Sequence, residues 1–230
     1  MSSIKDNLGT INKQIIETAI SCGRSPETIQ LIAVSKRKPV EAIIEGIKAG
    51  AKHFGENYIQ EAIDKIDKIG KNAACWHFIG HLQTNKVKFA VKYFDYIHTV
   101  DTEKLAMKID KQAKKIQKIQ KILVQVNIGE ENTKSGTRIA DTIQLITQIS
   151  TYKNIAVRGL MCMPPYFSDP DQARIYFQQL VWIKEKILDQ KSGAVSMEHL
   201  SMGMSNDFKV AIEEGSTMIR IGTAIFGGRD

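Results

Sequence analysis

The sequence predicts an α/β fold, a single (β/α)8 TIM barrel. Three observations support this: eight strand-like runs alternate with helical runs, the chain has 230 residues, and no linker or low-complexity segment divides it. Such alternation favours parallel strands joined by right-handed crossovers, and eight strands favour closure. One barrel can use this length in full. We therefore expect one domain over residues 1–230, with the barrel at about 30–227.

The elements follow from local patterns. A helical pattern covers residues 2–22 and ends at Gly23. Eight apolar runs predict strands at residues 30–35, 52–55, 76–80, 95–100, 121–127, 155–161, 195–200 and 217–222. Helical patterns separate these runs.

Helix boundaries are visible in several places. The helix expected at 39–50 has Pro39 near its first turn and stops at a glycine. The helix expected at 205–215 can be capped by Ser205. Only eight residues follow the last strand, too few for a full final helix. We expect the N-terminal helix to take that outer position instead.

Composition excludes several classes of protein. No apolar run reaches membrane-spanning length, and the first residues do not resemble a secretory signal. The three cysteines are widely spaced and odd in number, which favours a reducing compartment over a disulfide framework. We expect a cytoplasmic protein that does not bind membranes.

The net charge of +7 is concentrated between residues 104 and 121. Lysines recur there at helical spacing, at Lys104, Lys108, Lys111, Lys115 and Lys118. Apolar residues line another side, at Leu105, Ile109, Ala113 and Ile116. This pattern predicts an amphipathic helix with a solvated lysine face. No aromatic residue or binding motif accompanies the lysines, so we expect no nucleic-acid partner.

Lys36 closes the first strand run. On a barrel strand it would share the inner side with Ile32 and Val34. Burial next to apolar walls lowers an ammonium pKa, and a neutral amine is what Schiff-base formation needs. The alternative is a lysine that extends to the surface at the strand end and pairs with a carboxylate.

Small polar residues follow the last two strands. Ser201, Gly203 and Ser205 lie in LSMGMS, and Gly222 and Thr223 follow the eighth strand. Glycines allow close backbone approach, hydroxyls donate, and N–H groups at helix starts attract anions. Barrels often hold phosphate on these two loops. Ser205 alone could equally be a helix cap.

Arg220 stands within the eighth strand among apolar residues. A buried arginine must be paired or bound to an acceptor. The two interpretations are an internal ion pair and a donor aimed at a ligand, such as a ring nitrogen.

The histidines show no metal-binding pattern. His53, His77, His81, His98 and His199 fall mostly in strand runs, without a His-x-x-x-His helix or a nearby cysteine pair. We expect core or mouth histidines and no metal.

Seven segments together resemble one family. They are AVSK (33–36), HFGENYIQEA (53–62), WHFIGHLQTNK (76–86), VNIGEENTKSG (126–136), RGLMCMPP (158–165), LSMGMSNDF (200–208) and IRIGTAIFG (219–227). The chain is similar, nearly end to end, to the YggS-type pyridoxal 5′-phosphate (PLP) homeostasis proteins. That family resembles the barrel half of alanine racemase, the fold-type III scaffold for this cofactor. One departure is Asn206, where the family commonly has aspartate.

The resemblance implies roles for particular residues. Lys36 would carry the aldimine with PLP, and Arg220 would lie beside the pyridine nitrogen. Asn57 and Met161 match positions near the ring. The phosphate would be held at Ser201, Gly203, Gly222 and Thr223.

The resemblance implies a PLP-binding protein that buffers or delivers the cofactor. Arginine always donates, so it favours an unprotonated ring nitrogen and weakens the electron sink on which transaminases depend. We expect a monomer or weak dimer that binds PLP and performs no robust catalysis. Other B6 vitamers are further candidate ligands, and apo PLP-enzymes are candidate recipients of the cofactor.

Two enzyme functions stay open as alternatives. An amino-acid racemase would need a second acid/base, for which Tyr58 or Tyr166 would substitute, because the sequence shows no covering domain. A class I aldolase would use Lys36 against a sugar-phosphate carbonyl.

Overall fold

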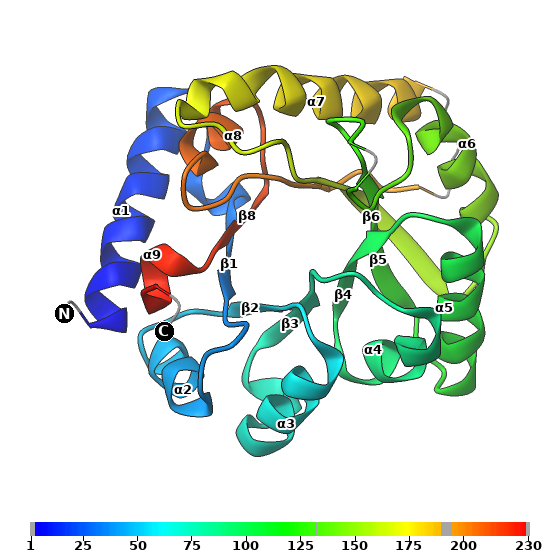
Figure 1. Cartoon of the computed structure of the whole chain (residues 1–230), viewed down its shortest axis with the longest axis horizontal. Coiled ribbons are helices and arrows are strands. Elements are labelled where there is room, and N and C mark those ends of the chain that lie inside the picture. Colours follow the sequence, from blue (N-terminus) through cyan, green and yellow to red (C-terminus); the bar gives the residue numbers. More distant parts are fainter. Residues whose placement is uncertain (1–2, 132, 190–194, 229–230) are drawn as a thin grey trace.

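The computed structural model describes residues 3–131, 133–189 and 195–228 and forms a closed barrel of eight parallel strands, ordered as in the chain (Figure 1). The strands are β1 Gln30–Val34, β2 His53–Glu56, β3 Cys75–Phe78, β4 Tyr96–Val100, β5 Gln120–Val126, β6 Ile155–Cys162, β7 His199–Ser201 and β8 Met218–Ile221. Pairing of β1 with β8 closes the ring. The predicted fold class is confirmed, and each strand lies within or beside its predicted run.

Helices surround the barrel, as Figure 1 shows. They are α1 Ile4–Ser21, α2 Val40–Lys48, α3 Ile59–Ile69, α4 Val87–Tyr93, α5 Glu103–Lys115, α6 Ile139–Ile149, α7 Arg174–Asp189, α8 Phe208–Glu213 and α9 Thr223–Phe226. Short 3-10 turns cover Pro26–Thr28, Lys71–Ala73, Thr84–Lys86 and Pro170–Ala173. No helix in the described ranges is long and apolar enough to cross a membrane.

Helix α1 takes the outer position that the short C-terminal segment leaves. Ser3 and Asp6 form a capping box at its start, which satisfies free N–H groups of the first turn. The helix packs against α2, α8 and α9, and Asn7 Nδ2 donates to Ile225 O at 2.9 Å. The expected placement is confirmed, although residue 2 of the predicted helix lies outside the described residues.

The core has two layers. Most apolar side chains pack between the strands and the helices. A smaller cluster lies inside the barrel and consists of Ile32, Tyr96, Leu123, Met161 and Met218. Much of the remaining interior is polar, because buried side chains of β3, β4, β7 and β8 form hydrogen bonds to one another there: His77, His98, Ser201 and Arg220. The barrel interior therefore provides a hydrogen-bonding route between its two ends.

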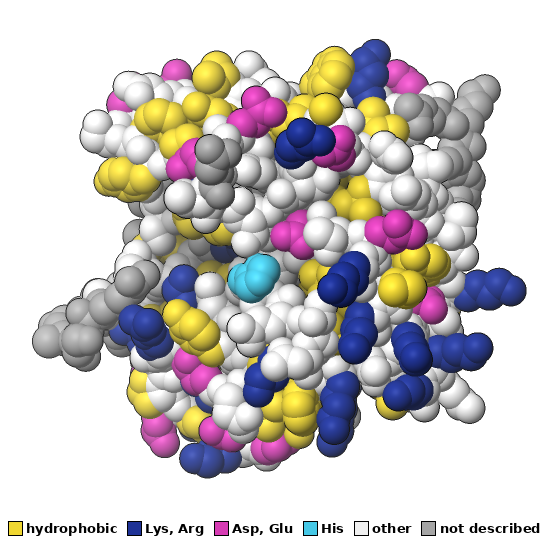
Figure 2. Space-filling view, turned by 45° about the vertical axis from the view of Figure 1, so that its right-hand side comes forward, with side chains coloured by type: hydrophobic (Ala, Val, Ile, Leu, Met, Phe, Trp, Pro, Cys, Tyr) yellow, Lys and Arg dark blue, Asp and Glu magenta, His cyan; other side chains and the backbone are white. Residues whose placement is uncertain are grey.

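Helix α5 is shorter than the lysine pattern indicated. It ends at Lys115, and Gln117 has φ +52°, which breaks the helix. Ile116, predicted on the buried side, is 50% exposed. Lys118 Nζ donates to Val91 O at 2.8 Å and to Phe94 O at 2.6 Å, so it is not part of the solvated face. The α5 side of Figure 1 comes forward in Figure 2, where Lys and Arg side chains gather on one part of the surface.

Two further boundaries differ from prediction. Strand β7 begins at His199 rather than at residue 195. Over the described residues 195–198, Ser196 N makes a 3.3 Å bond to Val157 O but no regular ladder forms. Helix α8 begins after Asp207 and not after Ser205. The carboxylate of Asp207 accepts from Met204 N at 2.6 Å, which fixes the turn before the helix.

Candidate functional site

The C-terminal ends of β1 and β8 meet at one end of the barrel. Lys36 follows β1 by two positions, and Gly222 directly follows β8. A Cβ atom added to Gly222 would lie 3.3 Å from Val34 O and 3.4 Å from Val34 Cβ. Residues almost 190 positions apart in the chain therefore come together at this mouth.

The turns after β7 and β8 are joined to each other. Thr223 Oγ1 donates to Ser205 Oγ at 3.3 Å, and Arg220 N donates to Gly203 O at 3.0 Å. Gly203 has φ +93°, and a Cβ atom there would lie 2.6 Å from Ala211 Cβ, so glycine is required. The two expected phosphate-type turns thus form one continuous surface.

Helix dipoles contribute little at this surface. Helix α8 has six residues and α9 has four, so few peptide dipoles are aligned. An anion here would depend mainly on backbone N–H groups and on the hydroxyls of Ser205 and Thr223.

Arg220 is buried just below the turns, with 4% of its surface exposed. Its Nη1 donates to Ser201 Oγ at 2.7 Å and its Nη2 to Cys162 O at 2.9 Å. Within the described part of the chain it forms no salt bridge. Burial lowers the pKa of Arg220, but a guanidinium still remains charged near neutrality. No carboxylate of the described residues therefore pairs directly with Arg220, although Asp207 contributes favourable charge at longer range. The ligand interpretation stays a prediction.

Ser201 accepts the hydrogen bond of Arg220 inside the barrel. Its side chain is fully buried, and Oγ also lies 3.0 Å from His98 Nδ1. The hydroxyl is therefore engaged in the interior, and the phosphate role expected for it stays a prediction. The reason is that Ser201, the last residue of β7, faces inward.

A chain of histidines continues below Ser201. His98 Nε2 lies 2.9 Å from His77 Nδ1, and His77 Nε2 lies 3.0 Å from His53 Nδ1. Burial, followed by neighbouring positive groups, lowers the pKa values of His77 and His98 well below the usual histidine value, so both rings are neutral. Sequence reasoning missed this chain. The available signal was that the histidines occupy inward positions of successive strands.

Asn57 lies at the rim of the mouth, directly after β2. Its Oδ1 is buried and has no hydrogen-bond partner among the described residues. Its backbone is pressed against Gly80, where a Cβ atom would lie 2.1 Å from Asn57 O. Asn57 lines a cavity of about 350 Å³ together with Met163, Tyr166 and residues from other mouth loops. A buried amide oxygen without a protein partner among the described residues is available to accept a hydrogen bond.

Met161 lies lower than the rim. It is fully buried in the interior cluster with Ile32, and its register partner on β7 is Ser201. Met163, two positions later, lines the mouth cavity instead. The family resemblance implies that Met161 lies near the PLP ring. In the structure, Met161 is part of the barrel interior beneath the mouth.

A buried ionic network supports the strand end that carries Lys36. Ser35 Oγ donates to Glu56 Oε1 at 2.7 Å, and Lys65 Nζ donates to Ser35 O and Glu56 Oε1, both at 2.8 Å. Burial raises the pKa of Glu56, although Lys65 and Ser35 oppose that rise. Sequence analysis did not identify this network, because Lys65 looks like an ordinary lysine on helix α3.

Comparison with known proteins agrees with this geometry. The family model described as alanine racemase, N-terminal domain, matches residues 20–230. A Vibrio alginolyticus protein named pyridoxal phosphate homeostasis protein is 44% identical over 234 residues, covering 100% of this chain and 99% of the relative. The solved structure of PipY from Synechococcus elongatus, with PLP bound, has a TM-score of 0.86 at 34% identity and covers 98% of this chain and 100% of PipY.

Likeness of fold extends further. An alanine racemase from Clostridium difficile has a TM-score of 0.72 at 17% identity, with coverage of 99% of this chain and 57% of the racemase. This match concerns the barrel architecture alone.

Proposed function

Since this chain belongs to the family of pyridoxal phosphate homeostasis proteins, we propose that it binds PLP at the C-terminal mouth of its barrel and takes part in homeostasis of that cofactor. The observation that supports the proposal is that the two joined turns lie above the buried Arg220 and that Gly222 approaches Val34, two positions before Lys36. Lys36, Arg220 and the turns would each match a different part of the cofactor.

The chemistry of the mouth fits the parts of PLP. A phosphate needs several donors in close approach, which the backbone at Gly203 and Gly222 and the hydroxyl of Thr223 can supply. A ring nitrogen needs a donor, which Arg220 supplies. Asn57 Oδ1, buried without a partner among the described residues, can accept from a polar group on the ring. When bound, the cofactor supplies an aldehyde that bonds to an amine and a conjugated ring that can accept electrons.

We assign Lys36 as the residue that holds the cofactor covalently. Ser201 would position Arg220, and Met161 would support the ring from below. These assignments rest on position and on chemical fit.

We infer a carrier rather than a robust catalyst. Arg220 stays a donor and favours an unprotonated ring nitrogen, which weakens the electron sink. A racemase would need a second acid/base held over the pocket. Tyr166 lines the mouth cavity but is 81% exposed, and Tyr58 is 46% exposed. Neither hydroxyl is fixed by burial in a catalytic position.

We further propose that the protein acts in the cytoplasm as a monomer or weak dimer, binds other B6 vitamers and hands PLP to apo-enzymes. Cys22, Cys75 and Cys162 are free thiols, which suits a reducing compartment.

Covalent trapping tests the proposal. The purified protein should absorb visible light, and borohydride should fix the cofactor to the peptide that contains Lys36. Lys36→Ala should lose the absorption band, whereas Lys86→Ala, a change in another mouth loop, should keep it. A colourless protein would favour the aldolase alternative, and a modified peptide without Lys36 would refute the assignment.

A further inference from the structure

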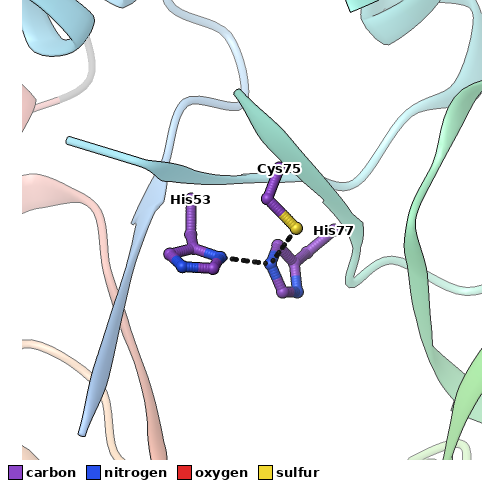
Figure 3. Close-up of side chains that lie close together, drawn as sticks. All are labelled: His53, Cys75 and His77. Carbon is purple, nitrogen blue, oxygen red and sulfur yellow. Dashed lines mark hydrogen bonds between the residues drawn. The ribbon is translucent and has the colours of Figure 1, made fainter. Parts of the chain in front are cut away.

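Three side chains that can bind a metal lie together at the N-terminal end of the barrel, opposite the mouth. His53 is the first residue of β2, Cys75 is the first residue of β3, and His77 follows two positions later. The parallel register pairs His53 with Cys75. Figure 3 shows the three side chains pointing toward one another from the two strands.

The distances between them approach those of a tetrahedral metal site. His53 Nδ1 lies 3.0 Å from His77 Nε2, and Cys75 Sγ lies 3.4 Å from the same nitrogen. All three ligand atoms lie within 4.8 Å of one another. Zinc bond lengths place two tetrahedral nitrogen ligands about 3.3 Å apart and a nitrogen and a sulfur about 3.6 Å apart. Small side-chain shifts would therefore admit the ion.

The cluster can be reached from outside. His53 and Cys75 are partly exposed, whereas His77 is buried. His53 also lines a cavity of about 540 Å³ that extends to Leu8 and Asn12 of α1. That cavity offers an entry path and room for a water ligand.

Charged groups near the cluster act in opposite directions. The negative charge of Asp95 would stabilise a cation bound beside the Cys75 thiol, whereas the positive charge of Lys121 would repel that cation. Burial raises the pKa of Cys75 to about 12, but a coordinating thiol is deprotonated by the cation itself.

We propose that His53 Nδ1, Cys75 Sγ and His77 Nε2 bind one Zn²⁺ ion, with water as the fourth ligand. Imidazole and thiolate together suit a borderline-soft cation, and three protein ligands plus water is a known zinc arrangement. On binding, the Cys75 proton passes to solvent and no electron is transferred. The site lies outside the proposed function and does not depend on the cofactor.

The same hydrogen bonds would couple the ion to Arg220. Arg220 donates to Ser201 Oγ, which leaves the Ser201 hydroxyl proton available to His98 Nδ1. We assign that direction in the metal-free protein, in which His98 and His77 would then both carry their proton on Nε2. Zinc at His77 Nε2 requires the proton on Nδ1 instead. His98 would then change tautomer too, and the Ser201 hydroxyl would become free to turn elsewhere. Each ring stays neutral throughout.

Metal titration of the full-length, metal-stripped protein tests the site. Zn²⁺ should bind with a stoichiometry of one, and Co²⁺ should produce thiolate charge-transfer absorption. Cys75→Ala and His53→Gln should each weaken binding by more than about 100-fold, since even an outer-shell partner of a metal ligand contributes about 10- to 100-fold. Cys22→Ala and His81→Gln are the matched controls and should bind as the unaltered protein does.

Folding is checked separately, because thermal melting of each metal-free variant shows whether it retains structure. Nitrogen NMR of histidine then gives a direct readout. Zn²⁺ should bring His77 Nε2 to a metal-bound shift and move the His98 proton from Nε2 to Nδ1. Binding equally strong in folded Cys75→Ala and His53→Gln, or no binding at all, would overturn the site. An unchanged His98 tautomer in the zinc-loaded protein would overturn the coupling.

Discussion

As a permanent hydrogen-bond donor, Arg220 could donate to a ring nitrogen but could not accept a proton from it. Ser201 Oγ and Cys162 O hold the guanidinium at two points, so its direction is set before any ligand arrives. A preoriented permanent donor loses less conformational entropy on binding than a free side chain does. At the residue scale, the proposed contact of Arg220 with the ring nitrogen would therefore favour cofactor binding over electron withdrawal from the ring.

Arg220→Glu tests this role. A carboxylate could pair with a protonated ring nitrogen, so the visible spectrum should titrate differently with pH, and side reactions with amino acids should increase. Arg220→Gln is the matched neutral change, useful if the glutamate variant does not fold. Spectra that stay the same across pH in both folded variants would show that Arg220 does not lie at the ring.

Alanine substitutions of Thr223 and Ser201 should differ in their effects on the binding of PLP and of unphosphorylated pyridoxal. Thr223→Ala should weaken PLP binding by about ten- to a hundredfold, the equivalent of about 1.5–3 kcal/mol for a charge-assisted hydrogen bond, and should leave unphosphorylated pyridoxal nearly unaffected. Ser201→Ala should weaken both ligands, because it releases Arg220. Isothermal titration with the two vitamers measures this. Loss of selectivity for phosphate in Ser201→Ala alone would contradict the assignment.

Some candidate site residues stand out in the sequence, whereas the contacts of others depend on the fold. A lysine at a strand end and an arginine inside an apolar strand are unusual enough to be noticed, as Lys36 and Arg220 were. The partner of the Ser201 hydroxyl depends on which way β7 turns its last residue. Only the closed barrel shows that Ser201 faces His98.

At the element scale, the mouth depends on how the ends of β1 and β2 are held. Lys65 of α3 bridges Ser35 O and Glu56 Oε1, which ties the helix to both strands immediately before Lys36. Both charged side chains are buried. Removing one partner of such a pair leaves an uncompensated charge.

Lys65→Met should therefore destabilise the fold at neutral pH by about 3–5 kcal/mol. The pKa of Glu56 is already raised by burial, and loss of Lys65 raises it further. Over the interval between the unfolded and folded pKa values the native state binds more protons, so stability increases as the pH falls. The deficit of the variant should thus shrink on acidification.

Denaturant unfolding at several pH values measures this effect. Lys68→Met changes an exposed lysine of the same helix and should cost little at any pH. Adding Glu56→Gln to Lys65→Met should recover stability, because the unpaired charge is removed. A deficit that grows toward acid pH would refute the explanation.

Element boundaries show where sequence patterns lose accuracy. The apolar periodicity continued to Ile116 and the lysine periodicity to Lys118, but the backbone leaves the helix at Gln117. Periodicity records which side chains could share a face, whereas the end of a helix also depends on tertiary bonds such as those of Lys118. Helix α8 is capped at Asp207 and not at Ser205 for a similar reason, because the Asp207 carboxylate accepts a hydrogen bond from Met204 N in the preceding turn.

At the scale of the whole molecule, closure of the barrel brings distant segments together. Alternation of strands and helices was sufficient to predict the architecture, and in barrels of this kind the chemistry lies at the C-terminal ends of the strands. The polar interior was not predictable, because which side chains point into the barrel depends on how neighbouring strands are aligned with one another. The same closure separates the proposed PLP-binding mouth from the histidine and cysteine cluster at the opposite end.

Cofactor transfer is the most direct test of a homeostatic role. The protein is loaded with PLP, freed of unbound cofactor and mixed with an apo-transaminase, whose activity is followed. We predict that the recipient gains activity, that Lys36→Ala transfers little, and that D- and L-amino acids undergo at most trace racemisation. Failure to activate the recipient, together with vigorous racemisation abolished by Lys36→Ala and by Tyr166→Phe or Tyr58→Phe, would contradict the carrier function and establish the racemase.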